Sequence, residues 1–228
     1  VVMGEVFAWI MGWSLILEYS LVVSAVAVSW SGYAAPLLNG WAGVPMALMQ
    51  APHAGGVANL PALFIIAVVA ALLIAGTRKS AGLTMILVAV KLSALAVFVW
   101  FALPHFNAAN LQPFSPYGFA RNMGADGVER GIMAAAAIIF SAFYGFDAIP
   151  TAAEETRNPK RDLAIGIIGS MFACAAIYTI IALAALGATP FTAFANSPEP
   201  LALILREINQ PGAARFLAVT AVLTLPTV

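Results

Sequence analysis

The sequence predicts an all-α polytopic membrane protein, and three observations support this. Hydrophobic residues make up 62% of the 228 residues, charged residues only 9%, and the mean hydropathy is +0.96. The apolar residues come in runs of about 20, the length at which a helix spans a hydrocarbon core of roughly 30 Å. Ten basic and ten acidic residues are too few to give a soluble domain of this size a polar surface.

We expect a single transmembrane domain over residues 1–228, with about six membrane-spanning segments and no soluble domain. The predicted spans cover about 6–33, 60–76, 83–103, 131–155, 163–188 and 212–228. A short helix over 201–208 precedes the last span, which is truncated. The first span is rich in small residues, including Gly12 and Gly32, which let helices approach closely in lipid. The chain begins inside an apolar segment without an initiator methionine, so we expect an internal piece of a longer protein.

The loops predict the orientation of these spans. The two short loops hold five basic residues, namely Arg78, Lys79, Arg157, Lys160 and Arg161. The three much longer loops hold three, namely Arg121, Arg130 and Arg206. By the positive-inside rule the short loops are cytoplasmic, so the first span runs from inside to outside.

The span 131–155 is predicted to break near 145–147. Gly145 is a weak helix former, Asp147 is costly in hydrocarbon, and Pro150 has no amide hydrogen for the preceding turn. We expect the helix to stop near Tyr144 and restart around 147–150. Irregular backbone at membrane depth occurs only where protein or a wet cavity satisfies it, and transporters build midplane binding sites in this way.

The break offers two kinds of binding group. The outer half-helix leaves unpaired carbonyls near residues 141–144, which suit an ammonium group, and the restarted half-helix offers free amides, which suit an anion. A zwitterionic amino acid carries both charges, so this type of site fits it. Potassium filters and sodium sites also use exposed carbonyls, so the pattern leaves ion sites open.

Three ionisable residues lie deep within predicted spans: Glu18, Lys91 and Asp147. Intramembrane charges face a partner or a cavity, and their alternative role is to pair and lock helices together. Lys91 lies eight residues into its span, about 12 Å at ~1.5 Å per residue, which is far for its stem to reach the interface. Because desolvation disfavours the charged form of lysine, this residue is a candidate proton carrier. Asp147 also suits the N-cap of the restarted half-helix.

Aromatic and charged residues flank the break. The aromatic side chains, which either gate the site or belong to the helix-packing core, are Phe140, Phe143, Tyr144 and Phe146. The charged residues that follow, which form either an inner gate of ion pairs or a solvated loop, include Glu154, Glu155 and Arg157.

Other classes of site lack their usual residues. His53 and His105 lie in different loops without ligand-spaced partners, so we expect no metal, and no motif indicates a cofactor. The net charge is zero, which suggests no nucleic-acid partner. We find neither a Ser/His/Asp set nor a metal pair, so we expect no enzyme. The expected partners are an amino acid, protons and the lipid bilayer, with no indication of oligomeric state.

The segment GFDAIPTAAEETRNPKRDLAIGI at 145–167 resembles the signature of the cationic amino acid transporter branch of the amino acid–polyamine–organocation (APC) superfamily. Residues 9–33 are similar to the family's third helix, and the region around Lys91 to its fifth. The resemblance covers the whole chain, as family helices three to the start of eight.

This resemblance implies a fold of two inverted five-helix repeats, with helices one and six broken at the site. It implies that the backbone carbonyls of Ser141, Ala142 and Tyr144, in the segment ending at Gly145, receive the substrate's ammonium group. Lys91 matches a lysine that replaces a sodium ion and is linked to proton coupling. Glu18 matches an acid near the side-chain pocket, and Asp147 the aspartate after the break.

The chain departs from the family pattern at two positions. Ser141 stands where an aromatic residue is usual, which suggests a larger pocket or a looser gate. Ala164 stands where proline is usual, at the start of the next helix. The first helix, which supplies the other half of the site in the family, has no counterpart in these 228 residues.

The predicted function is therefore a secondary active amino acid permease, proton-coupled and working by alternating access, in a bacterial-type plasma (inner) membrane. An exchanger or polyamine carrier without proton coupling is the alternative within transporters. A channel or a structural membrane subunit is the alternative outside them; a channel would show repeated polar residues along one face, and here they are isolated.

Overall fold

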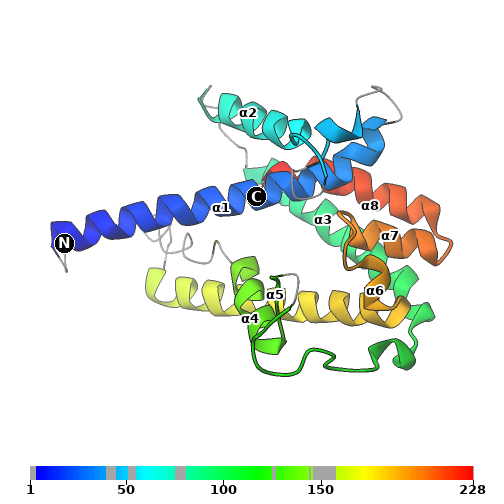
Figure 1. The fold of residues 1–228 in the computed structure, drawn as a ribbon. Coiled ribbons are helices and arrows are strands. Elements are labelled where there is room, and N and C mark those ends of the chain that lie inside the picture. The colour runs from blue at the N-terminus through cyan, green and yellow to red at the C-terminus, as the bar shows by residue number, and fades with distance from the viewer. Residues whose placement is uncertain are drawn as a thin grey trace. The chain divides into compact units, whose positions relative to one another are not determined.

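The computed structural model describes residues 4–39, 45–50, 55–74, 81–124, 127–143, 145 and 158–227. The described chain is mostly helical (Figure 1). Its α-helices are α1 (Glu5–Asn39), α2 (Leu60–Ile74), α3 (Ala81–Ala102), α4 (Ile132–Phe140), α5 (Pro159–Ala188), α6 (Phe191–Phe194), α7 (Pro200–Glu207) and α8 (Pro211–Thr224). Its short 3₁₀ turns are η1 (Met46–Leu48), η3 (Leu103–His105), η4 (Ala108–Leu111), η5 (Ser141–Phe143) and η7 (Leu225–Thr227).

Three of the described helical stretches are long and apolar enough to cross a membrane: Glu5–Leu37, Thr84–His105 and Arg161–Ala188. Two shorter apolar helices, Leu60–Ile74 and Pro211–Thr224, accompany them. These five stretches fall on the predicted spans at 6–33, 60–76, 83–103, 163–188 and 212–228. The all-α polytopic character predicted from composition is therefore what the structure shows.

The chain divides into two compact units. Unit 1 comprises Val1–Phe101 together with Thr192–Val228, and unit 2 comprises Ala102–Phe191.

In unit 1, α1 packs against α2 and α8, and α7 packs against α8, as Figure 1 shows for the last two helices. The contacts bury the C-terminal half of α1, where Ala27 and Ala34 are at most 4% exposed. Ile204 and Leu205 of α7 are fully buried. The short helix predicted at 201–208 is therefore α7, and its apolar face completes the core of this unit.

The first helix is longer than predicted. α1 continues past residue 33 to Asn39 and contains Pro36, where the sequence predicted a loop. A proline inside a helix removes the hydrogen bond that its amide would donate to the carbonyl four residues earlier, here that of Gly32, and its ring crowds that carbonyl. Burial of Ala34 within the packed end of α1 favours continuing the helix, so tertiary packing outweighs the local proline signal.

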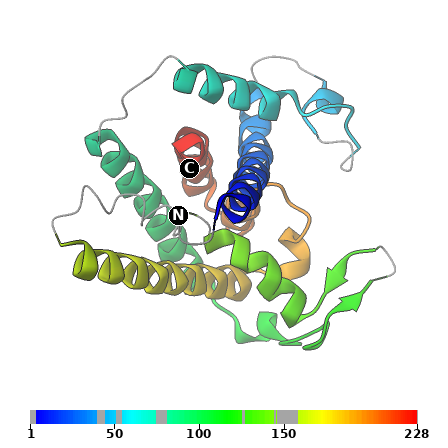
Figure 2. The ribbon, with the colours of Figure 1, turned by 90° about the vertical axis from the view of Figure 1, so that its left-hand side faces the viewer.

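In unit 2, the predicted loop before α4 contains a two-stranded hairpin that the sequence did not predict. β1 (Asn122–Met123) pairs antiparallel with β2 (Glu129–Arg130), with Asn122 opposite Arg130 (Figure 2). Gly131 follows with φ +112°, and a Cβ there would collide with the Ala120 carbonyl. This glycine lets the chain turn directly from the hairpin into α4.

The C-terminal end of α5 is firmly held in unit 2. The Asn107 amide and the Asn110 Nδ2 both donate to the Gly187 carbonyl, at 2.9 and 2.8 Å. The Phe106 ring lies where a Cβ on Gly187 would be, so only glycine permits this approach. The 30-residue α5 is thereby fixed against the segment 106–110.

Candidate functional site

α4 ends at Phe140, four residues before the predicted stop near Tyr144. The chain tightens into the 3₁₀ turn η5, and Gly145 then adopts φ +102°. That backbone conformation is open to glycine and strained for other residues, so the helix cannot continue regularly through it. Of the predicted site residues, Ser141, Ala142, Phe143 and Gly145 therefore lie together where the helix ends.

One side chain from another helix reaches this segment. Tyr178 of α5 donates its hydroxyl hydrogen to the Ala142 carbonyl at 3.2 Å. Its ring also packs edge-to-face on Phe143, with centroids 5.5 Å apart and an angle of 68° between planes. Tyr178 was not among the site residues predicted from the sequence. A signal was present, because it is the only tyrosine in the run 163–188 and a tyrosine hydroxyl in apolar surroundings needs a partner.

The remaining predicted residues of the break lie outside the described part of the chain. They are Tyr144, Phe146, Asp147, Glu154, Glu155 and Arg157. The restart of the helix around 147–150 stays a prediction for the same reason.

Glu18 and Lys91 lie in the middle of α1 and α3, as predicted, and both side chains are half-buried. Glu18 makes no hydrogen bond or ion pair with another residue that the structure describes. Both residues belong to unit 1, whereas the break belongs to unit 2.

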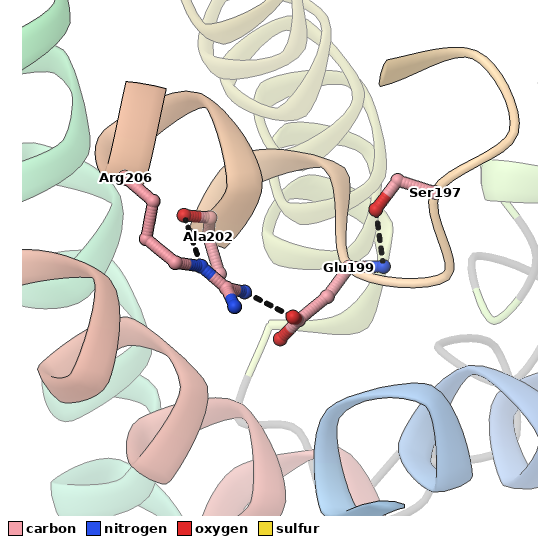
Figure 3. A network of polar contacts seen from close by, with 4 residues as sticks. All are labelled: Ser197, Glu199, Ala202 and Arg206. Atoms are coloured by element: carbon pink, nitrogen blue, oxygen red, sulfur yellow. Dashed lines mark hydrogen bonds and ion pairs between the residues drawn. The ribbon is translucent and has the colours of Figure 1, made fainter. Parts of the chain in front are cut away.

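A second polar cluster, also missed from the sequence, lies in unit 1 where α7 begins. Glu199, 7% exposed, is ion-paired with the Arg206 guanidinium, which also donates to the Ala202 carbonyl (Figure 3). The Ser197 hydroxyl accepts from the Glu199 amide at 3.2 Å. The spacing of seven residues, two helical turns, was a usable signal for the pair. Both residues line a pocket of about 290 Å³, together with Pro36, Leu37, Pro211, Ala214, Arg215 and Ala218.

The chain is similar to known membrane transporters. The family described as amino acid permease matches residues 1–226. The branched-chain amino acid permease BcaP of Bacillus subtilis (strain 168) is 39% identical over 231 residues, which include 99% of this chain and 48% of the relative. The methylthioribose transporter of the same organism is 33% identical, covering 100% of this chain and 48% of the relative.

A plant relative extends this similarity. The vacuolar cationic amino acid transporter 2 of Arabidopsis thaliana is 33% identical over 97% of this chain and 34% of its own length. The chain thus spans at most about half the length of these three relatives. They are named as permeases or transporters and not as enzymes.

Proposed function

The chain belongs to the amino acid permease family, and from this premise we propose that it is part of a proton-coupled amino acid transporter whose substrate binds at the break after α4. The family makes it a multi-pass membrane transport protein. The substrate, the coupling ion, the plasma (inner) membrane location and the arrangement in two inverted five-helix repeats are parts of the proposal.

The proposed position of the substrate site is based on how α4 ends. Ser141–Phe143 and Gly145 take the backbone out of the α-helix within the predicted span 131–155. The last carbonyls of a helix have no intrahelical donor, so they are available to a positively charged ammonium group. Ala142 is exposed in unit 2, and its carbonyl accepts a hydrogen bond from the Tyr178 hydroxyl.

The proposed coupling residue is Lys91. It lies near the middle of α3, a helix long and apolar enough to cross the membrane. A lysine held away from bulk water can exchange a proton as its surroundings change, which suits a carrier that alternates between two sides. Glu18 is proposed to line the side-chain pocket. The proposed gates or structural supports are Phe143, Phe146, Asp147, Glu154, Glu155 and Arg157.

The test uses the complete gene product in liposomes, with labelled leucine and arginine and with or without an inward proton gradient. We expect gradient-driven accumulation of at least one of the two. In Lys91→Ala the accumulation should fall to the level without a gradient, while counterflow exchange of the same amino acid persists. The exposed Arg121→Ala variant is the control and should transport as wild type does.

Two results would change this conclusion. Uptake that ignores the gradient, or that Lys91→Ala leaves unchanged, would favour an exchanger without proton coupling. No uptake by folded wild-type protein would refute amino acid transport.

A second candidate substrate comes from the similarity to the methylthioribose transporter. A neutral thiosugar has no ammonium group and would not use the carbonyls of 141–143 in the same way. Methylthioribose as a competitor of leucine uptake separates the candidates, because an amino acid site should be insensitive to it.

A further inference from the structure

The contact between α5 and the break joins two segments 36 residues apart in the chain. Tyr178 makes two different interactions with successive residues, a hydrogen bond to the Ala142 carbonyl and a ring contact with Phe143. A single contact could be incidental packing. Two contacts fix both the direction of the carbonyl and the plane of the neighbouring ring, so they define the local shape of η5.

The helix that carries Tyr178 is suited to serve as a fixed support. Tyr178 lies nine residues before Gly187, about 14 Å along α5 at ~1.5 Å per residue. Gly187 is held by Asn107 and Asn110 and covered by the Phe106 ring. The tyrosine is therefore attached to the better-anchored part of α5, whereas η5 follows a helix of nine residues in which Ala134 alone is buried.

The hydrogen bond leaves the carbonyl able to bind a ligand. A carbonyl oxygen has two lone pairs and the Tyr178 hydroxyl uses one of them. The second can accept a hydrogen bond from an ammonium group. Because the hydroxyl fixes the direction of the C=O bond, the second lone pair is preorganised and a ligand does not have to order it on binding.

We infer that Tyr178 is a positioning residue of the substrate site, which holds the Ala142 carbonyl in the direction that receives the substrate's ammonium group. This role rests on the proposed function above. The hydroxyl does the positioning, and the ring contact with Phe143 keeps the hydroxyl in reach.

The first test compares Tyr178→Phe with wild type in the complete gene product in liposomes. The substitution removes one hydroxyl and keeps the ring contact. We expect the KM for the transported amino acid to rise about fivefold, the effect of losing one hydrogen bond, while the maximal rate changes little. The matched control is Tyr117→Phe, which removes an exposed hydroxyl in the same unit and keeps the ring that stacks with Arg130. It should leave KM unchanged.

A competition experiment distinguishes positioning from general support of the fold. If leucine is transported, it is compared as a competitor with 4-methylpentanoate, which lacks the amino group. For a different substrate, its own deaminated analogue is used. In Tyr178→Phe, inhibition by the amino acid should weaken about fivefold and inhibition by the deaminated acid should stay the same, because only the former uses the carbonyl. Phe143→Leu, which removes the ring contact and keeps the hydroxyl, should give a smaller shift in the same direction.

Three results would overturn the role of Tyr178. They are an unchanged KM in Tyr178→Phe, an equal shift for both competitors, and a Tyr178→Phe protein that no longer folds, since the hydroxyl would then serve stability. In each of these cases wild-type uptake leaves the proposed function standing. If the folded wild type takes up no amino acid, the proposed function fails and this role fails with it.

Discussion

Two regions of the molecule are built in contrasting ways: the end of α1 with α7 and α8 in unit 1, and the break after α4 in unit 2. In the first, the Trp30 Nε1 donates to the Val222 carbonyl at 2.8 Å, and the Asn59 Nδ2 donates to the Ser31 hydroxyl at 2.6 Å. Glu199 is buried and ion-paired with Arg206, and Ile204 and Leu205 of α7 are fully buried. In the second, Tyr178 of α5 contacts η5 through a hydrogen bond to the Ala142 carbonyl and a ring contact with Phe143.

Under the proposed function, the first region would serve as the rigid frame of the transporter and the break as its moving element. Segments with many buried side-chain contacts open only at high free energy, and segments with few such contacts are those that change conformation in binding and gating. A transporter needs both, because substrate must be released on the second side of the membrane. Substitutions in the first region should therefore lower stability, whereas those at the break should alter KM.

The largest expected effect in the first region is that of Gly32→Ala. A Cβ on Gly32 would lie 2.8 Å from the Pro198 carbonyl oxygen and 2.9 Å from the Pro198 Cβ. The chain before α7 would have to move away from α1, which we expect to lower the free energy of unfolding by about 2–3 kcal/mol. The measurement is the thermal unfolding midpoint of the complete gene product in detergent.

Gly12→Ala is the matched control on the same helix. Nothing lies within 4 Å of its Cβ in the described chain, and alanine is the better helix former, so stability should stay equal or rise slightly. Equal losses from both variants would show that close packing of Pro198 on α1 does not hold this region.

The next effect is that of Glu199→Gln, which removes the charge of a side chain 9% exposed and keeps its shape. Arg206 then loses its ionic partner, at a cost of about 1–2 kcal/mol because its own side chain is 44% exposed and partly solvated. Glu129→Gln breaks the exposed pair with Arg121, 3.7 Å apart, and should change stability by less than about 0.5 kcal/mol. If the unfolding midpoint of Glu199→Gln changes as little as that of Glu129→Gln, the ion pair between Glu199 and Arg206 does not stabilise this region.

The sequence predicted most helices because their apolar runs are long, and because the residues that interrupt helices, glycine and proline, are visible in the sequence itself. α4 ends at Phe140, four residues before the predicted stop near Tyr144, while Gly145, whose conformational freedom is readable from its identity alone, takes a positive φ. The extension of α1 through Pro36 was missed because the packing that favours it involves α2 and α8, far away in the chain.

The contacts between residues far apart in the chain could not be predicted from the sequence. Small residues on the first span predicted close approach in general, yet in the structure Gly32 meets Pro198 while Gly12 meets nothing within 4 Å among the described residues. The two glycines look alike in a hydropathy pattern. Likewise, the carbonyl of Ala142 was predicted as a binding group, but its contact with Tyr178 depends on how α5 lies beside η5.

The smallest expected effect on stability is that of substitutions at Asn59, whose side chain makes two different hydrogen bonds. Asn59 caps α2, accepting from the Ala62 amide at 3.1 Å, and also donates to the Ser31 hydroxyl. Asn59→Ala loses both and should lower the free energy of unfolding by about 1 kcal/mol, the usual value of an N-cap. Asn59→Asp keeps the cap and loses only the donor, so its loss should be smaller, whereas Asn196→Ala, at an exposed asparagine, should be neutral. If Asn59→Asp loses as much as Asn59→Ala, the bond to Ser31 rather than the cap ties α2 to α1. That outcome would sharpen the contrast with the break, because the frame would then depend on links between helices and not on the stability of each helix alone.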